Sequence, residues 1–122
     1  MATQPERLKA RTKQFAIRIV RVFESLPKND EARIIGKQLL RAGTSVAANY
    51  RAVYRSRAKP EFISRMSVVV EEADETAFWL ETIPEGRLRD LLTEANELLA
   101  IFVASLWTAR QGRKNQSVNV SQ

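Results

Sequence analysis

Four long stretches of the chain repeat their large apolar residues every three or four positions, the spacing that places side chains on one face of an α-helix. They cover about residues 6–25, 30–55, 60–82 and 87–110. Pro27, Pro60 and Pro84 lie in or beside the short links between them, and the 122 residues contain only four glycines and four prolines. So few turn-forming residues argue against a β-sandwich or barrel. We therefore expect an all-α protein, an antiparallel up-down-up-down four-helix bundle.

The two ends of the chain have different predicted roles. The bundle domain is expected at residues 1–110, and the polar residues 111–122, which lack apolar periodicity, are predicted to form a flexible tail.

After Met1 there is no apolar segment of the signal-peptide type. The longest apolar run, 98–107, is too short to cross a bilayer. We expect a cytoplasmic protein without a membrane partner.

The chain contains no cysteine and no histidine. This excludes disulfides, zinc sites with thiolate or imidazole ligands, cysteine nucleophiles and Ser-His-Asp triads. Helical bundles that hold two iron or manganese ions use Glu-x-x-His pairs, which a chain without histidine cannot form. We expect neither an enzyme nor a bound metal or cofactor.

Residues 38–49, QLLRAGTSVAAN, combine small side chains with one arginine inside a predicted helix. The small residues allow another helix to approach closely. Arg41, Ser45 and Asn49 are four positions apart and share a face that borders the apolar stripe. A half-buried arginine there needs a carboxylate or several carbonyl groups to offset its desolvation. The predicted structural network, in which the arginine faces a carboxylate of the next helix, comprises Arg41, Ser45, Asn49, Glu71 and Glu75.

Charge is divided unevenly along the chain. Residues 1–60 contain 14 Lys and Arg against 4 Asp and Glu, a net charge of +10, whereas residues 61–122 contain 6 against 10, a net charge of −4. The basic half is suited to a polyanion, because guanidinium groups bind phosphate and aromatic rings stack on bases. The candidate nucleic-acid-binding residues are Arg7, Arg11, Arg18, Arg21, Tyr50, Arg51, Tyr54, Arg55, Arg57 and Lys59. The alternative is that these are solvated charges around packing tyrosines, or that they pair with acidic helices of a neighbour.

The last predicted helix is more apolar than one core requires. Between Leu98 and Trp107 only Ser105 is polar, so apolar side chains point in every direction around the helix. Packing within one chain leaves one such face uncovered, and burial against another subunit would cover it. The predicted oligomer interface consists of Ile101, Val103 and Trp107.

Three motifs, in their order and spacing, resemble a known family. They are QLLRAGTSVAANYR at 38–51, EFISRM at 61–66 and EEADETAFWLE at 71–81. Together they are similar to the four-helix bundle proteins of the 23S rRNA intervening-sequence family, over roughly residues 15–102. The family usually has an acidic residue three positions after the asparagine, where this chain has Ala52. Because this acidic residue is absent, every charged residue between positions 50 and 59 is basic, which favours polyanion binding.

The resemblance implies an assembly as well as a fold. Family members are antiparallel four-helix bundles that form ring-shaped homopentamers, and many are encoded within intervening sequences of bacterial large-subunit rRNA genes. A related group serves as accessory subunits of diversity-generating retroelements, in which a basic pentameric barrel engages the reverse transcriptase and nucleic acid. The resemblance thus implies a bacterial, pentameric scaffold, with a reverse transcriptase as a candidate partner.

From these observations we predict a non-catalytic homo-oligomeric scaffold. Its basic surface would bind nucleic acid, either rRNA or retroelement RNA or DNA. The alternative is a protein-interaction scaffold that engages an acidic protein partner and binds no nucleic acid.

Overall fold

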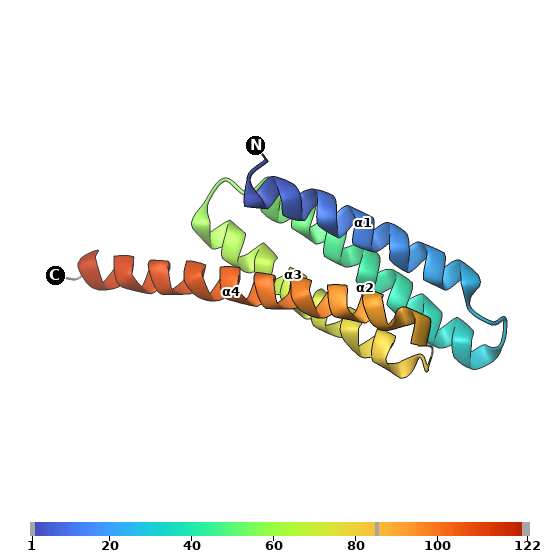
Figure 1. The fold of residues 1–122 in the computed structure, drawn as a ribbon. Helices are drawn as coiled ribbons and strands as arrows, with labels where there is room; N and C mark the ends of the chain where they lie inside the picture. The colour runs from blue at the N-terminus through green and yellow to red at the C-terminus, as the bar shows by residue number, and fades with distance from the viewer. Residues whose placement is uncertain (1, 85, 121–122) are drawn as a thin grey trace.

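The computed structural model describes residues 2–84 and 86–120, with side chains described as far as Gly112. In this part of the chain four helices form a bundle: α1 (Gln4–Ser25), α2 (Asp30–Tyr54), α3 (Lys59–Thr82) and α4 (Arg89–Val120), the last preceded by a 3-10 turn, η1 (Gly86–Leu88). Successive helices run in opposite directions, as the up-down-up-down prediction requires (Figure 1). The protein is the all-α four-helix bundle that the sequence predicts.

Helix starts are fixed by caps that differ slightly from the prediction. Thr3 and Glu6 form a reciprocal capping box, in which each side chain accepts a hydrogen bond from the other residue's backbone N–H, at 3.2 and 3.1 Å. Helix α1 therefore begins at Gln4, before the expected position 6. Asn29 caps α2 by accepting from the Ala32 N–H at 2.9 Å, so Asp30 is the first helical residue, at the predicted start of the helix.

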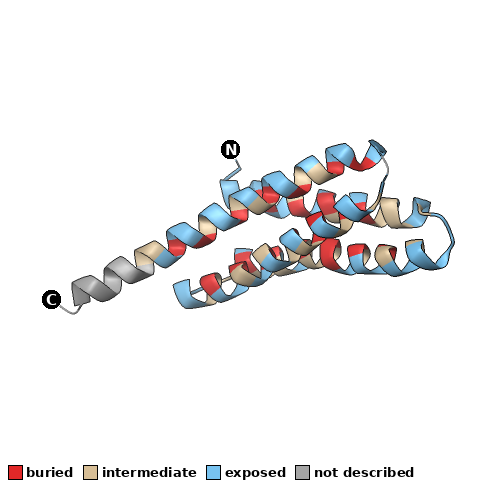
Figure 2. Ribbon diagram, turned by 90° about the horizontal axis from the view of Figure 1, so that it is seen from below, coloured by how far each residue is buried: buried red, intermediate tan, exposed pale blue. Residues whose placement is uncertain are grey.

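The core lies between the inward faces of the four helices, where the buried residues gather (Figure 2). Large side chains from each helix fill the core, and the burial of each one contributes about 1.5–3 kcal/mol to the free energy of unfolding. The largest fully buried apolar side chains are Phe15, Phe102, Ile19, Leu39, Met66, Leu98, Val46 and Val69. The predicted apolar stripes of α1 and α2 thus do form the core.

The buried face of α3 matches its apolar spacing except near Val70. Val69 and Thr76 are fully buried, whereas Val70, four positions after Met66 and three before Ala73, is only partly buried. Thr76 tolerates burial because its hydroxyl donates a 2.7 Å hydrogen bond to the Glu72 carbonyl oxygen one turn earlier.

Two glycines of α2 allow α1 to approach closely. A Cβ atom at Gly43 would lie 2.7 and 2.9 Å from the Cγ1 and Cγ2 atoms of Ile19, and one at Gly36 would lie 2.9 Å from a methyl group of Leu26. These distances are shorter than ordinary carbon contacts. The predicted helix that packs closely against residues 38–49 is therefore α1.

Helix α4 continues to Val120, beyond the predicted end near Arg110. No proline interrupts residues 111–120, Gly112 keeps a negative φ, and a helix already formed extends more easily than it starts. The last part of α4 projects past the α2–α3 link (Figure 1). The boundary predicted at residue 110 is thus not the end of a helix, and residues 121–122 of the predicted tail lie outside the described residues.

The described segment Gly86–Gly112 is long and apolar enough to cross a membrane by length and composition alone. Its contacts are those of a core helix, because Leu98 and Phe102 are buried against the other helices and Glu94 forms an ion pair with Arg11 of α1. We therefore interpret α4 as a helix of the bundle.

Candidate nucleic-acid interface

The first turns of α1, the end of α2 and the start of α3 meet at one end of the bundle (Figure 1). The Tyr50 hydroxyl of α2 donates to the Pro5 carbonyl oxygen of α1 at 3.5 Å, which joins segments 45 positions apart in sequence. All five predicted cations at this end are exposed. We call this surface the basic end, and it comprises Arg7, Arg51, Arg55, Arg57 and Lys59.

Side chains of the basic end form few contacts with the rest of the protein. The Arg7 guanidinium donates to the Ala2 carbonyl oxygen at 2.9 Å, and the Lys59 ammonium lies beside Gly112 of α4. Among the described residues, no carboxylate lies within ion-pair distance of the side chains of Arg51, Arg55 or Arg57. The carboxylate of Glu61 lies nearby but accepts from the Arg57 backbone N–H at 3.3 Å and pairs with Arg65, so it forms no ion pair with these three guanidinium groups.

Tyr50 is not available to stack on a base. Its side chain is only 3% exposed, and its ring stacks on Phe102 with centroids 5.6 Å apart. Burial, with a smaller effect of Tyr54, raises the pKa of Tyr50 to about 12. The predicted contact between Tyr50 and nucleic acid is wrong, because this ring belongs to the core.

Tyr54, one turn further along α2, lies on the surface and is 39% exposed. The Lys9 ammonium of α1 lies over its ring, 4.6 Å from the centroid, in a cation–π contact. The contact holds the Lys9 side chain against α2.

Arg11 connects α1 to α4. Its Nε and one terminal nitrogen donate to the two carboxylate oxygens of Glu94, at 2.8 and 2.6 Å, and the same terminal nitrogen contacts Glu97 at 2.7 Å. The hydrogen bond from Arg11 lowers the pKa of Glu94, and the same bond raises the pKa of Arg11. Arg11 was predicted to contact nucleic acid, but its guanidinium is engaged within the bundle.

Arg18 and Arg21 lie on the other half of α1, away from the basic end. Both are exposed, and they border a surface hollow of about 310 Å³ together with Ser25 and Arg87. The Arg87 guanidinium donates to the Ser25 hydroxyl at 3.0 Å. The cations predicted as one surface therefore form two separate patches.

Lys9 and Lys13, which the predicted site omits, line a different hollow. It lies between α1 and α2, encloses about 400 Å³, and is lined by Lys9, Lys13, Ala47, Ala48 and Arg51. We call it the α1–α2 hollow. The sequence does contain a signal for it, because lysines four apart share a helix face and two consecutive alanines leave space beside it.

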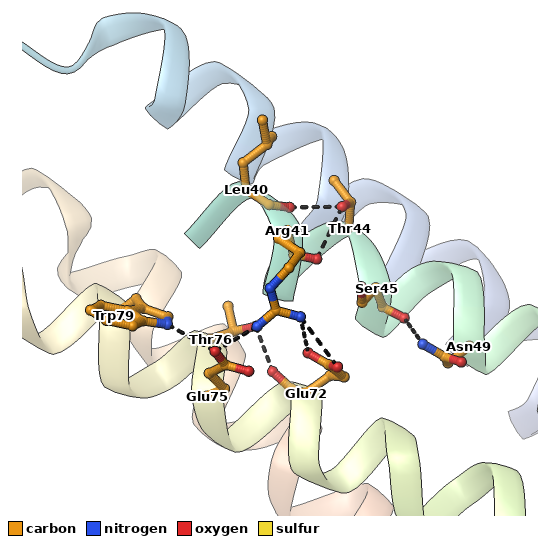
Figure 3. A network of polar contacts seen from close by, with 9 residues as sticks. All are labelled: Leu40, Arg41, Thr44, Ser45, Asn49, Glu72, Glu75, Thr76 and Trp79. Atoms are coloured by element: carbon orange, nitrogen blue, oxygen red, sulfur yellow. Dashed lines mark hydrogen bonds and ion pairs between the residues drawn. The ribbon is translucent and has the colours of Figure 1, made fainter. Parts of the chain in front are cut away.

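The structural network centres on Arg41, whose side chain is 48% exposed (Figure 3). Its guanidinium contacts Glu75 at 2.5 Å and Glu72 at 3.2 Å, and Glu75 also accepts from the Trp79 indole N–H at 3.2 Å. The bond from Arg41, and then that from Trp79, lowers the pKa of Glu75. The predicted partner Glu71 is exposed instead, and the neighbouring Glu72 pairs with Arg41.

Ser45 and Asn49 form a separate pair further along α2 (Figure 3). The Asn49 amide donates to the Ser45 carbonyl oxygen at 2.8 Å, and Ser45 participates through its backbone. Asn49 bonds nearby backbone as the sequence suggests, but neither residue joins the Arg41 ion pairs.

The predicted oligomer interface on α4 is largely uncovered in the single chain. Trp107 is 64% exposed and Val103 is 47% exposed, one helical turn apart. Ile101 is partly buried and packs against the core, so it contributes less to the open surface.

Within the described part of the chain, no group of three acidic side chains is placed to hold a metal ion.

The fold and the surface together define a basic all-α four-helix bundle. Residues 7–102 match the model of the 23S rRNA-intervening sequence protein family, so the chain belongs to this family. The structure is also similar to the crystal structure of a protein of unknown function from the S23 ribosomal protein family of Bacteroides thetaiotaomicron. The sequence identity is 25%, the match covers 85% of this chain and 98% of that one, and the TM-score is 0.76. Comparison with curated proteins finds no match.

Proposed function

We propose that the protein is a non-catalytic, homo-oligomeric scaffold that binds nucleic acid through its basic end. The observation that supports this is the division of the cations into two groups. Arg11 and Arg41 have carboxylate partners on another helix, whereas the guanidinium groups of Arg51, Arg55 and Arg57 have none within the described residues. Clustered cations without partners gain most from a polyanion, which neutralises them and releases its own counterions.

The pattern fits binding through the phosphate backbone and not recognition of a base sequence. The exposed ring here, Tyr54, is already in contact with Lys9, and the Tyr50 ring is buried. Contacts to phosphate position a protein without reading sequence. Ribosomal RNA and retroelement RNA or DNA are the candidates that the family resemblance adds.

The uncovered Val103 and Trp107 support self-assembly, since a large exposed tryptophan beside a valine is unfavourable in water. We propose a ring-shaped pentamer, by resemblance to the family, and a reverse transcriptase as a partner on the same ground. Light scattering at micromolar concentration tests the assembly, and a monomer would contradict it.

The nucleic-acid function is tested by fluorescence anisotropy with a labelled 20-nucleotide single-stranded RNA at 50–300 mM salt. The test variant replaces Arg51, Arg55 and Arg57 by Gln. The control removes the same charge from exposed cations elsewhere, with Lys28, Lys37 and Arg89 replaced by Gln.

If each arginine contacts one phosphate, the slope of log K against log salt falls by about 2 in the test variant, and the control changes little. No binding by the wild type at 50 mM salt would remove the proposed function. Equal losses in the test and control variants would remove the basic end as its site. Equal affinity for poly-glutamate would favour the acidic-protein alternative.

A further inference from the structure

The two sides of α1 differ in how their cations are neutralised. On the side facing α4, Arg11 is bound by Glu94 and Glu97. On the side facing α2, Lys9 and Lys13 border the α1–α2 hollow and, among the described residues, have no carboxylate within ion-pair distance. One helix therefore has one internally neutralised side and one open side.

The open side follows from the composition of α2. Beyond Glu31, near its start, α2 contains no acidic residue, so nothing on this helix can neutralise the lysines of α1. Arg51 of α2 adds a third cation at the same hollow. Three cations around one concave surface create a stronger positive potential than the same charges on a convex surface, because the low-dielectric walls focus the field.

The hollow has space for a ligand because its floor is made of small side chains. Ala47 and Ala48 each extend only to Cβ, so the long stems of Lys9 and Lys13 border an unfilled volume of about 400 Å³. The cation–π contact between Lys9 and Tyr54 holds one wall in place. The lining thus combines an apolar floor with cationic walls.

We propose that the α1–α2 hollow is a phosphate site for one phosphodiester group of a bound nucleic acid, held by Lys9, Lys13 and Arg51. The proposal rests on the proposed function and specifies where the backbone enters the protein. Arg51 belongs to both surfaces, so a strand seated in the hollow continues onto the basic end at Arg55. Lysine ammonium groups act as point charges toward phosphate, which suits binding without sequence preference.

The sharpest test puts one negative charge into the hollow. Ala48→Glu places a carboxylate among the three cations, and Ala48→Gln has the same size without the charge. Gln38→Glu is the location control, since it adds the same charge at an exposed position ten residues earlier on α2, about 15 Å away. A second variant, Lys9→Gln with Lys13→Gln, removes two of the cations. Circular dichroism and light scattering check that each variant keeps its fold and assembly.

Binding is measured by anisotropy with labelled 20-nucleotide single-stranded RNA and DNA of the same sequence, and with poly-glutamate. If removing both lysines abolishes the single phosphate contact of the hollow, the double variant loses affinity about 8-fold at 50 mM salt and about 3-fold at 200 mM. Ala48→Glu should weaken binding at least as strongly, while Ala48→Gln and Gln38→Glu remain close to the wild type. The ratio of RNA to DNA affinity tells which backbone the hollow prefers.

The two hypotheses fail in different ways. A wild type that binds neither RNA nor DNA contradicts the proposed function and the phosphate site with it. A wild type that binds, with Ala48→Glu no weaker than Gln38→Glu, overturns the phosphate site alone. Poly-glutamate that binds as tightly as RNA and responds to the same variants would also overturn it, because the hollow would then take carboxylates.

Discussion

Replacing Gly43 by alanine should destabilise the protein, although alanine is the better helix former. The substitution itself favours the helix by about 1 kcal/mol. The added methyl group, however, would lie 2.7 Å from Cγ1, 2.9 Å from Cγ2 and 3.2 Å from Cβ of Ile19. Ile19 is fully buried and its branched side chain is stiff, so it cannot turn away. Overpacking costs about 1–3 kcal/mol, and three contacts with a rigid side chain favour the upper value. The net loss is about 2 kcal/mol.

A double-mutant cycle in urea, followed by circular dichroism, measures this clash directly. Ile19→Ala alone should cost about 2–5 kcal/mol, because it removes buried methyl groups and leaves a cavity. In that background Gly43→Ala no longer meets Cγ1 or Cγ2 and should stabilise by about 1 kcal/mol. The coupling energy between the two positions is then about 3 kcal/mol.

Gly112→Ala is the matched control, since it makes the same change in a helix. The atom nearest to a Cβ there is the Lys59 ammonium nitrogen at 2.7 Å, the mobile end of a long side chain that can move away. This variant should be unchanged or up to about 1 kcal/mol more stable. If Gly43→Ala were equally stable, or if the cycle showed no coupling with Ile19, the close approach of α1 to α2 would be refuted.

Three further predictions concern charged and exposed groups. Glu94→Gln should make unfolding less sensitive to acid. The folded-state pKa of Glu94 is lowered below its unfolded value near 4.3. The stability that the ionised Glu94 contributes is therefore complete above that value and is lost as pH falls through the lower folded pKa. Urea titrations of the wild type and the variant between pH 3 and 6 compare how their free energies of unfolding depend on pH. Arg41→Met should cost less than about 1 kcal/mol at pH 7, since the arginine is half-exposed, and should raise the pKa of Glu75 in a carboxyl NMR titration; an unchanged Glu75 pKa would contradict the network. Trp107→Glu should lower the mass found by light scattering, whereas Trp107→Phe should not, and equal masses for both would exclude this residue from the interface.

Helix positions could be predicted from the sequence because each helix is longer than five turns and is bounded by prolines, caps or a glycine turn. The start of α1 was predicted two residues late, although Thr3 and Glu6 provide the capping-box pattern. The end of α4 could not be predicted from apolar periodicity. That pattern reports which residues pack against a core. The part of a helix that projects beyond the bundle packs against no core and needs no apolar stripe.

Side-chain partners were harder to predict than helices. Tyr50 lies four positions after Val46 and three before Val53, so its spacing already placed it on the core stripe, while its hydroxyl and its basic neighbours suggested a surface role. The choice between Glu71 and Glu72 as a partner of Arg41 depended on which carboxylate lies opposite the arginine across the α2–α3 contact, which apolar periodicity does not report. Periodicity gives the face of a helix, but not the residue across from it.

The charges of α1 show how this limit affects function. The spacing of Arg7, Arg11, Arg18 and Arg21, at four, seven and three positions, groups them on one face of α1, and on an isolated helix all four would be equally solvated. In the bundle, α1 lies between a helix that carries Glu94 and Glu97 and a helix that presents small residues and no carboxylate to Lys9 and Lys13. The arginine face of α1 is thus partly neutralised by the carboxylates of α4. Lys9 and Lys13 lie outside that face, and their side chains border a helix without carboxylates beyond Glu31, so they stay open to a ligand. The anion-binding surface of such a bundle is therefore set by the neighbouring helix at least as much as by the basic helix itself.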